Sequence, residues 1–146
     1  MKLNKDTNIL IVGLGLLGGS YAEALTNAGY TVNAVTKEQS SVDFALKKGI
    51  IKYGTTKLEE YIISAADLVI FALYPHVFTK WIEKNQHLLK SGAVITDVTG
   101  VKGCIVYKIQ EMLRPDVEFI AAHPMAGREV CGVKTATPAF SGALTT

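Results

Sequence analysis

Short runs of apolar residues alternate along the chain with segments in which apolar residues recur at helical spacing. The apolar runs are rich in β-branched residues and are flanked by glycine and polar residues, which is typical of strands buried on both faces. The sequence therefore predicts five strands, at residues 8–12, 31–35, 67–72, 93–97 and 118–122.

Amphipathic segments follow these runs and predict helices near residues 16–28, 42–46, 58–65, 75–82 and 105–113. Gly29 and Gly49 provide stop signals, and Pro75 is suited to a helix start. Strands that alternate with helices imply right-handed βαβ units and a parallel sheet. We therefore expect an α/β fold of the Rossmann type, with a doubly wound parallel sheet that forms a single domain over residues 1–146.

A glycine-rich turn joins the first predicted strand to the first predicted helix. It reads Gly13-Leu14-Gly15-Leu16-Leu17-Gly18 and matches the dinucleotide-binding pattern G-x-G-x-x-G. The first glycine permits the tight turn, the second lets the backbone approach a pyrophosphate, and the third allows close packing of the helix. The free N–H groups of the helix would then face the phosphates. All six residues are predicted to bind the cofactor, although a strand-to-helix turn without a ligand would have the same pattern.

The end of the second strand bears on the choice between NAD and NADP. NAD-binding domains usually place an acid there for the ribose hydroxyls. This chain has Thr36 and Lys37 instead, with Ser40 shortly after, and the nearest acid is Glu38. We predict that Thr36, Lys37 and Ser40 favour NADP over NAD; the alternative is a polar loop indifferent to the extra phosphate.

Two further segments follow later strands, at the edge where open parallel sheets bind ligands. Thr99 follows the strand that ends in Asp97, and His123 follows the last strand. A histidine there can accept a proton from a substrate hydroxyl, and its ordinary pKa near ~6.5 suits a general base. Asp97 could instead only fix the following turn. Leu73, directly after the third strand, completes the predicted cofactor-binding set.

Composition excludes several classes of protein. The chain has 15 Lys and Arg against 13 Asp and Glu, a net charge of +2 without a basic stripe, which argues against nucleic-acid binding. No apolar run approaches membrane-spanning length, and residues 1–7 lack the apolar stretch of a secretion signal. Cys104 and Cys131 do not have the spacing of metal ligands. We expect a cytoplasmic protein with no metal, membrane or nucleic-acid partner.

The segments GLGLLGGS, DVTGVKG and HPMAGRE, in this order and spacing, resemble the prephenate dehydrogenase family, which includes arogenate dehydrogenases. The resemblance covers about residues 8–142, and HPMAG is its most specific part. It implies oxidative decarboxylation of prephenate to 4-hydroxyphenylpyruvate in tyrosine biosynthesis, with hydride transfer to NAD(P). His123 corresponds to the catalytic histidine, which hydrogen-bonds the ring hydroxyl. Arogenate is the alternative substrate, because it differs only by a side-chain amino group.

The chain departs from the family in two respects. Many members have a serine near the substrate hydroxyl where this chain has Gly100; Thr99 or a water molecule could supply that hydroxyl, and Thr99 could also line the nicotinamide pocket. Family members also carry a helical C-terminal domain that forms a homodimer and binds the substrate carboxylates. That domain is missing here, so we expect a truncated part that binds cofactor with little turnover. The non-catalytic alternative is a nucleotide-sensing NAD(P)-binding module.

Overall fold

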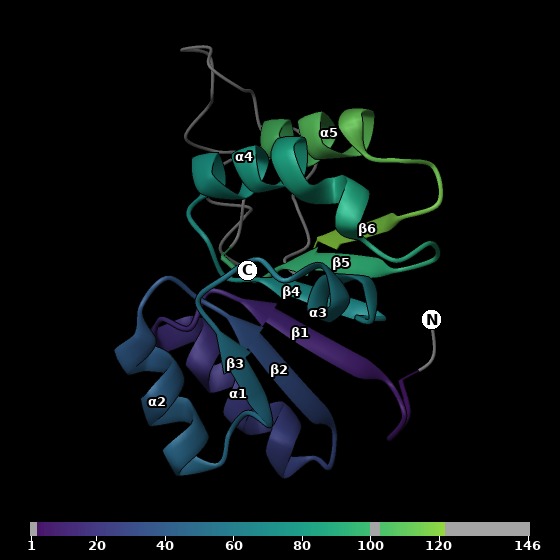
Figure 1. The fold of residues 1–146 in the computed structure, drawn as a ribbon. Coiled ribbons are helices and arrows are strands. Elements are labelled where there is room, and N and C mark those ends of the chain that lie inside the picture. Colours follow the sequence, from purple (N-terminus) through teal and green to yellow (C-terminus); the bar gives the residue numbers. More distant parts are fainter. Residues whose placement is uncertain (1–2, 100–102, 122–146) are drawn as a thin grey trace, which may run out of the picture.

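The computed structural model describes residues 3–99 and 103–121. Its strands are all parallel and form one six-stranded sheet in the order β3-β2-β1-β4-β5-β6 (Figure 1). The strands are β1 (Asn8–Val12), β2 (Thr31–Val35), β3 (Tyr53–Thr55), β4 (Leu68–Phe71), β5 (Val94–Asp97) and β6 (Glu118–Ala121). The strand order reverses between β1 and β4, which is the switch point of a Rossmann fold. The predicted fold class is therefore confirmed.

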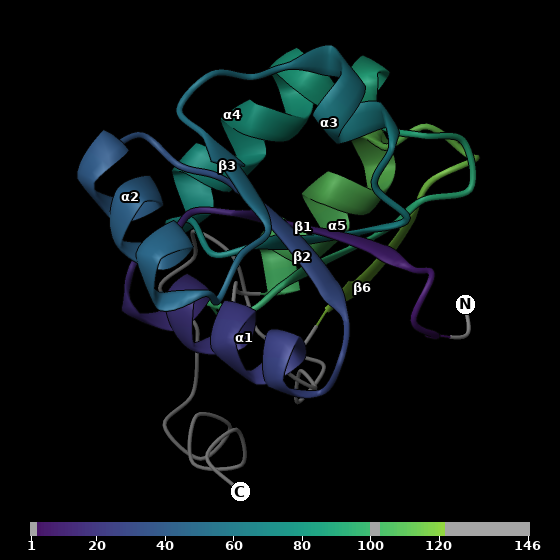
Figure 2. The same ribbon diagram turned by 60° about the horizontal axis from the view of Figure 1, so that its bottom comes forward.

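Five α-helices connect these strands in the described part of the chain. They are α1 (Leu16–Asn27), α2 (Gln39–Lys48), α3 (Glu60–Ser64), α4 (Pro75–Asn85) and α5 (Gly103–Met112), with a 3₁₀ turn at Gln86–Leu88. Helices α1 and α2 cover one face of the sheet, whereas α4 and α5 cover the other (Figures 1 and 2). Each face has its own apolar core, because strands buried on both sides direct alternate side chains to opposite faces.

The edge strand β3 is absent from the five strands that the sequence predicts. It has only three residues, Tyr53–Thr55, and a glycine lies at its centre. A Cβ at Gly54 would lie 2.9 Å from Val42 Cγ1 and 2.8 Å from Ile51 Cδ1, so glycine lets β3 approach α2 closely. A short strand with a central glycine lacks the apolar run by which the other strands are identified.

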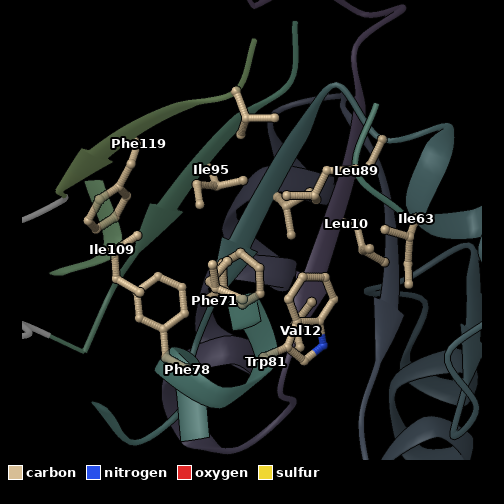
Figure 3. Packing of buried hydrophobic residues seen from close by; sticks show 14 of the residues in the cluster. Leu10, Val12, Ile63, Phe71, Phe78, Trp81, Leu89, Ile95, Ile109 and Phe119 are labelled. Carbon is tan, nitrogen blue, oxygen red and sulfur yellow. The ribbon is translucent and has the colours of Figure 1, made fainter. Parts of the chain in front are cut away.

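The core under α4 is built around aromatic rings (Figure 3). The ring of Phe71 in β4 lies 4.8 Å from those of Phe78 and Trp81, and the ring of Phe78 lies 5.7 Å from that of Phe119. These tilted and edge-on contacts are the favoured geometries of aromatic pairs. They fix α4 across β4 and β6, and so hold the loop between β4 and α4 in place.

Arg114 joins the end of α5 to the end of α4. Its guanidinium donates to the carbonyl oxygens of Gln86 at 2.9 Å and Leu89 at 2.8 Å. The Gln86 side chain returns bonds to the backbone of Met112 and Arg114. The guanidinium also lowers the pKa of Asp116 to about 2. Carbonyls left without partners where the helices end are thereby satisfied.

Asp67 joins the amino ends of β1 and β4 and gives a prediction for the pH dependence of stability. Its carboxylate accepts from the Asn8 N–H at 2.9 Å and pairs with Lys90. The Asn8 bond first, and then Lys90, lower its pKa below the ordinary 3.8. The contribution of the ionised Asp67 carboxylate to the free energy of unfolding is present above pH ~4. It is lost as the pH falls through the lowered pKa of Asp67 in the folded state.

We therefore expect Asp67→Asn to lower the free energy of unfolding by about 1 kcal/mol at pH 7. The difference from the wild type should shrink as the pH falls below about 4. Urea unfolding, followed by the fluorescence of the single tryptophan, Trp81, measures this. Asp6→Asn, at an exposed position, is the matched control and should change stability little. A difference for Asp67→Asn that persists unchanged to pH 2 would contradict this account.

Candidate functional site

The turn after β1 is held by the ends of the two neighbouring strands. Gly13 has φ +101° and donates its N–H to the carbonyl of Val35 in β2 at 2.8 Å. A Cβ at Gly13 would lie 2.6 Å from the carbonyl oxygen of Ala72, just beyond β4. Both the backbone conformation and the close approach require glycine here. The turn is thereby fixed at the switch point of the sheet.

The other two glycines of the motif have opposite surroundings. A Cβ at Gly18 would lie 1.9 Å from the carbonyl oxygen of Gly13, so α1 packs directly on the turn. A Cβ at Gly15 would meet no protein atom within 4 Å. Only Gly13 and Gly18 are thus required by the packing of the protein itself. The space beside Gly15 is open to a ligand.

The start of α1 offers free hydrogen-bond donors to that space. Gly15 is its N-cap, and no side chain caps the helix. The first turn contains no acidic residue, and the side chain of Leu16 is 96% exposed. Free N–H groups and the helix dipole favour an anion at this position.

The residues predicted to favour NADP lie beside the turn. The Leu14 N–H donates to Thr36 Oγ1 at 3.2 Å, so the hydroxyl at the end of β2 is tied to the glycine-rich turn. The N–H of Thr36 donates to the carbonyl of Thr55 at 3.1 Å, which continues the pairing of β2 with β3. Lys37 and Ser40 are exposed just beyond. The structure thus brings together the turn, a hydroxyl and a cation.

Thr99 connects the ends of β4 and β5 on the other side of the switch point. Its Oγ1 lies 3.0 Å from the carbonyl oxygen of Leu73 and 2.7 Å from Oδ1 of Asp97. The Asp97 side chain is only 1% exposed, so its bond to Thr99 holds the loop after β5. This bond agrees with the turn-fixing alternative for Asp97. Leu73 and Thr99 therefore lie side by side at the carboxyl edge of the sheet.

Other residues singled out in the sequence are not brought into this site. His123, Gly100 and Lys102 lie outside the described residues. His76 lies in the first turn of α4 and His87 in the following 3₁₀ turn. Within residues 3–99 and 103–121, no group of three or more His, Cys, Asp or Glu could hold a metal ion. In the same residues, no helix is both long and apolar enough to span a membrane.

A cavity of about 510 Å³, which the sequence did not predict, lies between α1 and α2. It borders the turn at Gly15 and Leu16 and extends to Phe44 and Lys48. Lys48 lines it, with Nζ 3.5 Å from Glu23 Oε1 and 5.7 Å from the centre of the Phe44 ring. Neither Leu73 nor Thr99 lines this cavity. The sequence carries no signal for it, because it depends on the spacing of two helices.

Comparison with known proteins places this geometry in a family. The family model described as "Prephenate dehydrogenase, nucleotide-binding domain" matches residues 21–144. A prephenate dehydrogenase of Bacillus subtilis is 30% identical over 93% of the chain and 37% of its own length. A probable NADP(+) prephenate dehydrogenase of Schizosaccharomyces pombe is 24% identical over 82% of the chain and 28% of its own length.

Solved structures give the same result. Prephenate dehydrogenase from A. aeolicus, in complex with hydroxyphenyl propionate and NAD+, is 32% identical with a TM-score of 0.73. The similarity covers 88% of this chain and 45% of that one. Synechocystis arogenate dehydrogenase is 26% identical with a TM-score of 0.71, over 85% of this chain and 43% of that one. The chain thus spans less than half the length of these relatives.

Proposed function

The chain belongs to the family of nucleotide-binding domains of prephenate dehydrogenases, and from this we propose that it is the cofactor-binding part of an enzyme that oxidatively decarboxylates prephenate. The observation that carries the proposal is the pattern of space around the glycine-rich turn. Cβ atoms would be blocked at Gly13 and Gly18 but free at Gly15. This is what a turn needs when its backbone must approach a pyrophosphate.

The described residues fit a nicotinamide dinucleotide. The pyrophosphate would lie against Gly15 and the uncapped start of α1. The adenosine ribose would lie near Thr36 and Lys37, and the nicotinamide near Leu73 and Thr99. In this proposed arrangement the two halves of the dinucleotide would lie on either side of the β1–β4 switch point, where ligands bind in open α/β sheets. The nicotinamide supplies the hydride acceptor when bound.

His123 is the proposed catalytic residue, by resemblance to the family and by its position two residues after β6. Its imidazole would accept the proton of the ring hydroxyl while hydride leaves the carbon that bears that hydroxyl. Loss of the ring carboxylate as carbon dioxide makes the ring aromatic, and the proton returns to the resulting phenol oxygen. The product is 4-hydroxyphenylpyruvate, and the cofactor is reduced by two electrons.

The preference for NADP can be tested at the end of β2. An acid at position 36 would bind the ribose hydroxyls of NAD and repel the 2′-phosphate of NADP. We expect Thr36→Asp to weaken NADP binding at least about tenfold and to strengthen NAD binding, since a charged hydrogen bond contributes about 1.5–3 kcal/mol. Isothermal titration calorimetry with both cofactors measures the change.

Thr36→Ser is the matched control, because it keeps the hydroxyl that accepts from Leu14. It should retain the cofactor preference of the wild type. The proposed preference is wrong if the wild-type chain binds NAD more tightly than NADP.

Arogenate is the second candidate substrate, favoured by the structural similarity to the Synechocystis arogenate dehydrogenase. The two substrates differ only by a side-chain amino group, and none of the contacts proposed for this chain involves that group. Comparing kcat/KM for prephenate and arogenate in the longest natural reading frame that contains this chain would separate them. We also propose that this protein is cytoplasmic and forms a homodimer.

A further inference from the structure

We infer that Lys57 is a second cation that selects NADP, acting with Lys37 on the 2′-phosphate of the adenosine ribose. The inference rests on the proposed function, since it concerns the same cofactor site. The structural observation is that the two lysines follow the carboxyl ends of neighbouring parallel strands, β2 and β3, at equivalent positions.

The register of β2 and β3 places these lysines together. Val35 pairs with Thr55, so Lys37 and Lys57 are each the second residue beyond a paired strand end. The bond from the Thr36 N–H to the Thr55 carbonyl at 3.1 Å continues the pairing one residue past the end of β2. Neighbouring strands lie about 4.8 Å apart. Two flexible lysine side chains that follow neighbouring strand ends by two residues each can reach one phosphate group between them.

Both cations are available to a ligand. Lys37 and Lys57 are exposed, and no ion pair given for residues 3–99 and 103–121 includes either of them. The acids nearest in sequence are Glu38 and Glu59. Glu59 Oε1 accepts from the Tyr53 hydroxyl at 2.8 Å, at the first residue of β3. The Glu59 carboxylate is therefore engaged by the Tyr53 hydroxyl rather than by either lysine.

The backbone at Lys57 is fixed without its side chain. The N–H of Lys57 donates to Thr55 Oγ1 at 3.1 Å, and its carbonyl accepts from the Glu59 N–H at 3.0 Å. Lys57→Ala retains both bonds, so it removes a charge without removing the loop. A pair of like charges with no anion between them is unfavourable, and a dianionic phosphate reverses that repulsion.

Calorimetric titration of the chain with NADP and NAD tests the inference. Lys57→Ala should weaken NADP binding about tenfold and leave NAD binding unchanged, as Lys37→Ala should. Lys52→Ala is the matched control. Lys52 is exposed just before β3, at the amino ends of the strands, and its N–H donates to the Val32 carbonyl near the start of β2. It should change neither affinity. Titrations with adenosine 2′,5′-bisphosphate and with 5′-AMP, which also differ by the 2′-phosphate, repeat the comparison without the nicotinamide.

The outcomes separate this inference from the proposed cofactor preference. Suppose that the wild type prefers NADP and that Lys37→Ala weakens NADP binding. If Lys57→Ala then leaves NADP binding unchanged, or weakens NADP and NAD binding equally, the inference about Lys57 is wrong and the preference stands. If the wild type shows no preference for NADP, the preference is wrong and the inference fails with it.

Discussion

Replacing His123 by asparagine, in the longest natural reading frame that contains this chain, is expected to lower kcat for prephenate by about 10²–10⁴-fold. That range is the usual contribution of a positioned general base. Asparagine is close to histidine in size and keeps a hydrogen-bonding group, but it has no nitrogen that accepts a proton near neutral pH. The affinity for NADP should stay unchanged, because His123 acts on the substrate hydroxyl.

Steady-state kinetics and cofactor titration together test this role. His76→Asn is the matched control: His76 is exposed in the first turn of α4, and its loss should leave kcat within about twofold. Unchanged turnover in the His123 variant would refute the catalytic assignment. It would favour a nucleotide-sensing module if cofactor binding persisted.

Gly15→Ala is expected to abolish most dinucleotide binding while leaving the protein folded. Gly15 has φ −73° and ψ −162°, which alanine also adopts, and the added Cβ would meet no protein atom within 4 Å. The methyl group would occupy the space in which the pyrophosphate meets the N–H groups of α1. Loss of one such charged hydrogen bond corresponds to about tenfold to a hundredfold weaker binding. Stability should fall by about 1 kcal/mol or less, because alanine is a poorer N-cap than glycine.

Two matched variants distinguish loss of binding from loss of structure. Gly18→Ala places a Cβ 1.9 Å from the carbonyl oxygen of Gly13 and should destabilise the fold by about 3 kcal/mol or more, since backbone must move. Gly19→Ala meets nothing within 4 Å inside α1 and should stabilise the protein by up to about 1 kcal/mol. Thermal unfolding and calorimetry measure both effects. Normal cofactor affinity in a folded Gly15→Ala variant would show that the glycine-rich turn is not part of the cofactor site.

Hydrophobic periodicity was sufficient to predict most of the sheet, because β1, β2, β4 and β5 are largely buried runs of apolar residues. The strand β3 was not predicted, since Tyr53–Thr55 is partly exposed and contains Gly54. Its presence became visible only through its pairing with β2 and its contact with α2. Edge strands of this kind are defined by tertiary packing rather than by their own residues.

The same limit applies to the site. The motif around Gly15 and the polar end of β2 are local signals, so the sequence located them. Lys57 had no signal of its own, because its relation to Lys37 depends on the register of a strand that the sequence did not predict. The bond between Thr99 and Leu73 likewise joins loops 26 residues apart.

The most direct test of the central claim is a titration of the ¹⁵N-labelled chain with NADP, followed by amide chemical shifts. We predict the largest shifts at Leu16 and Leu17 in the first turn of α1, at Thr36 after β2, and at Leu73 and Thr99 across the switch point. Amide shifts confined to Phe44 and Lys48, in the cavity between α1 and α2, or no shifts at all, would contradict dinucleotide binding at this turn.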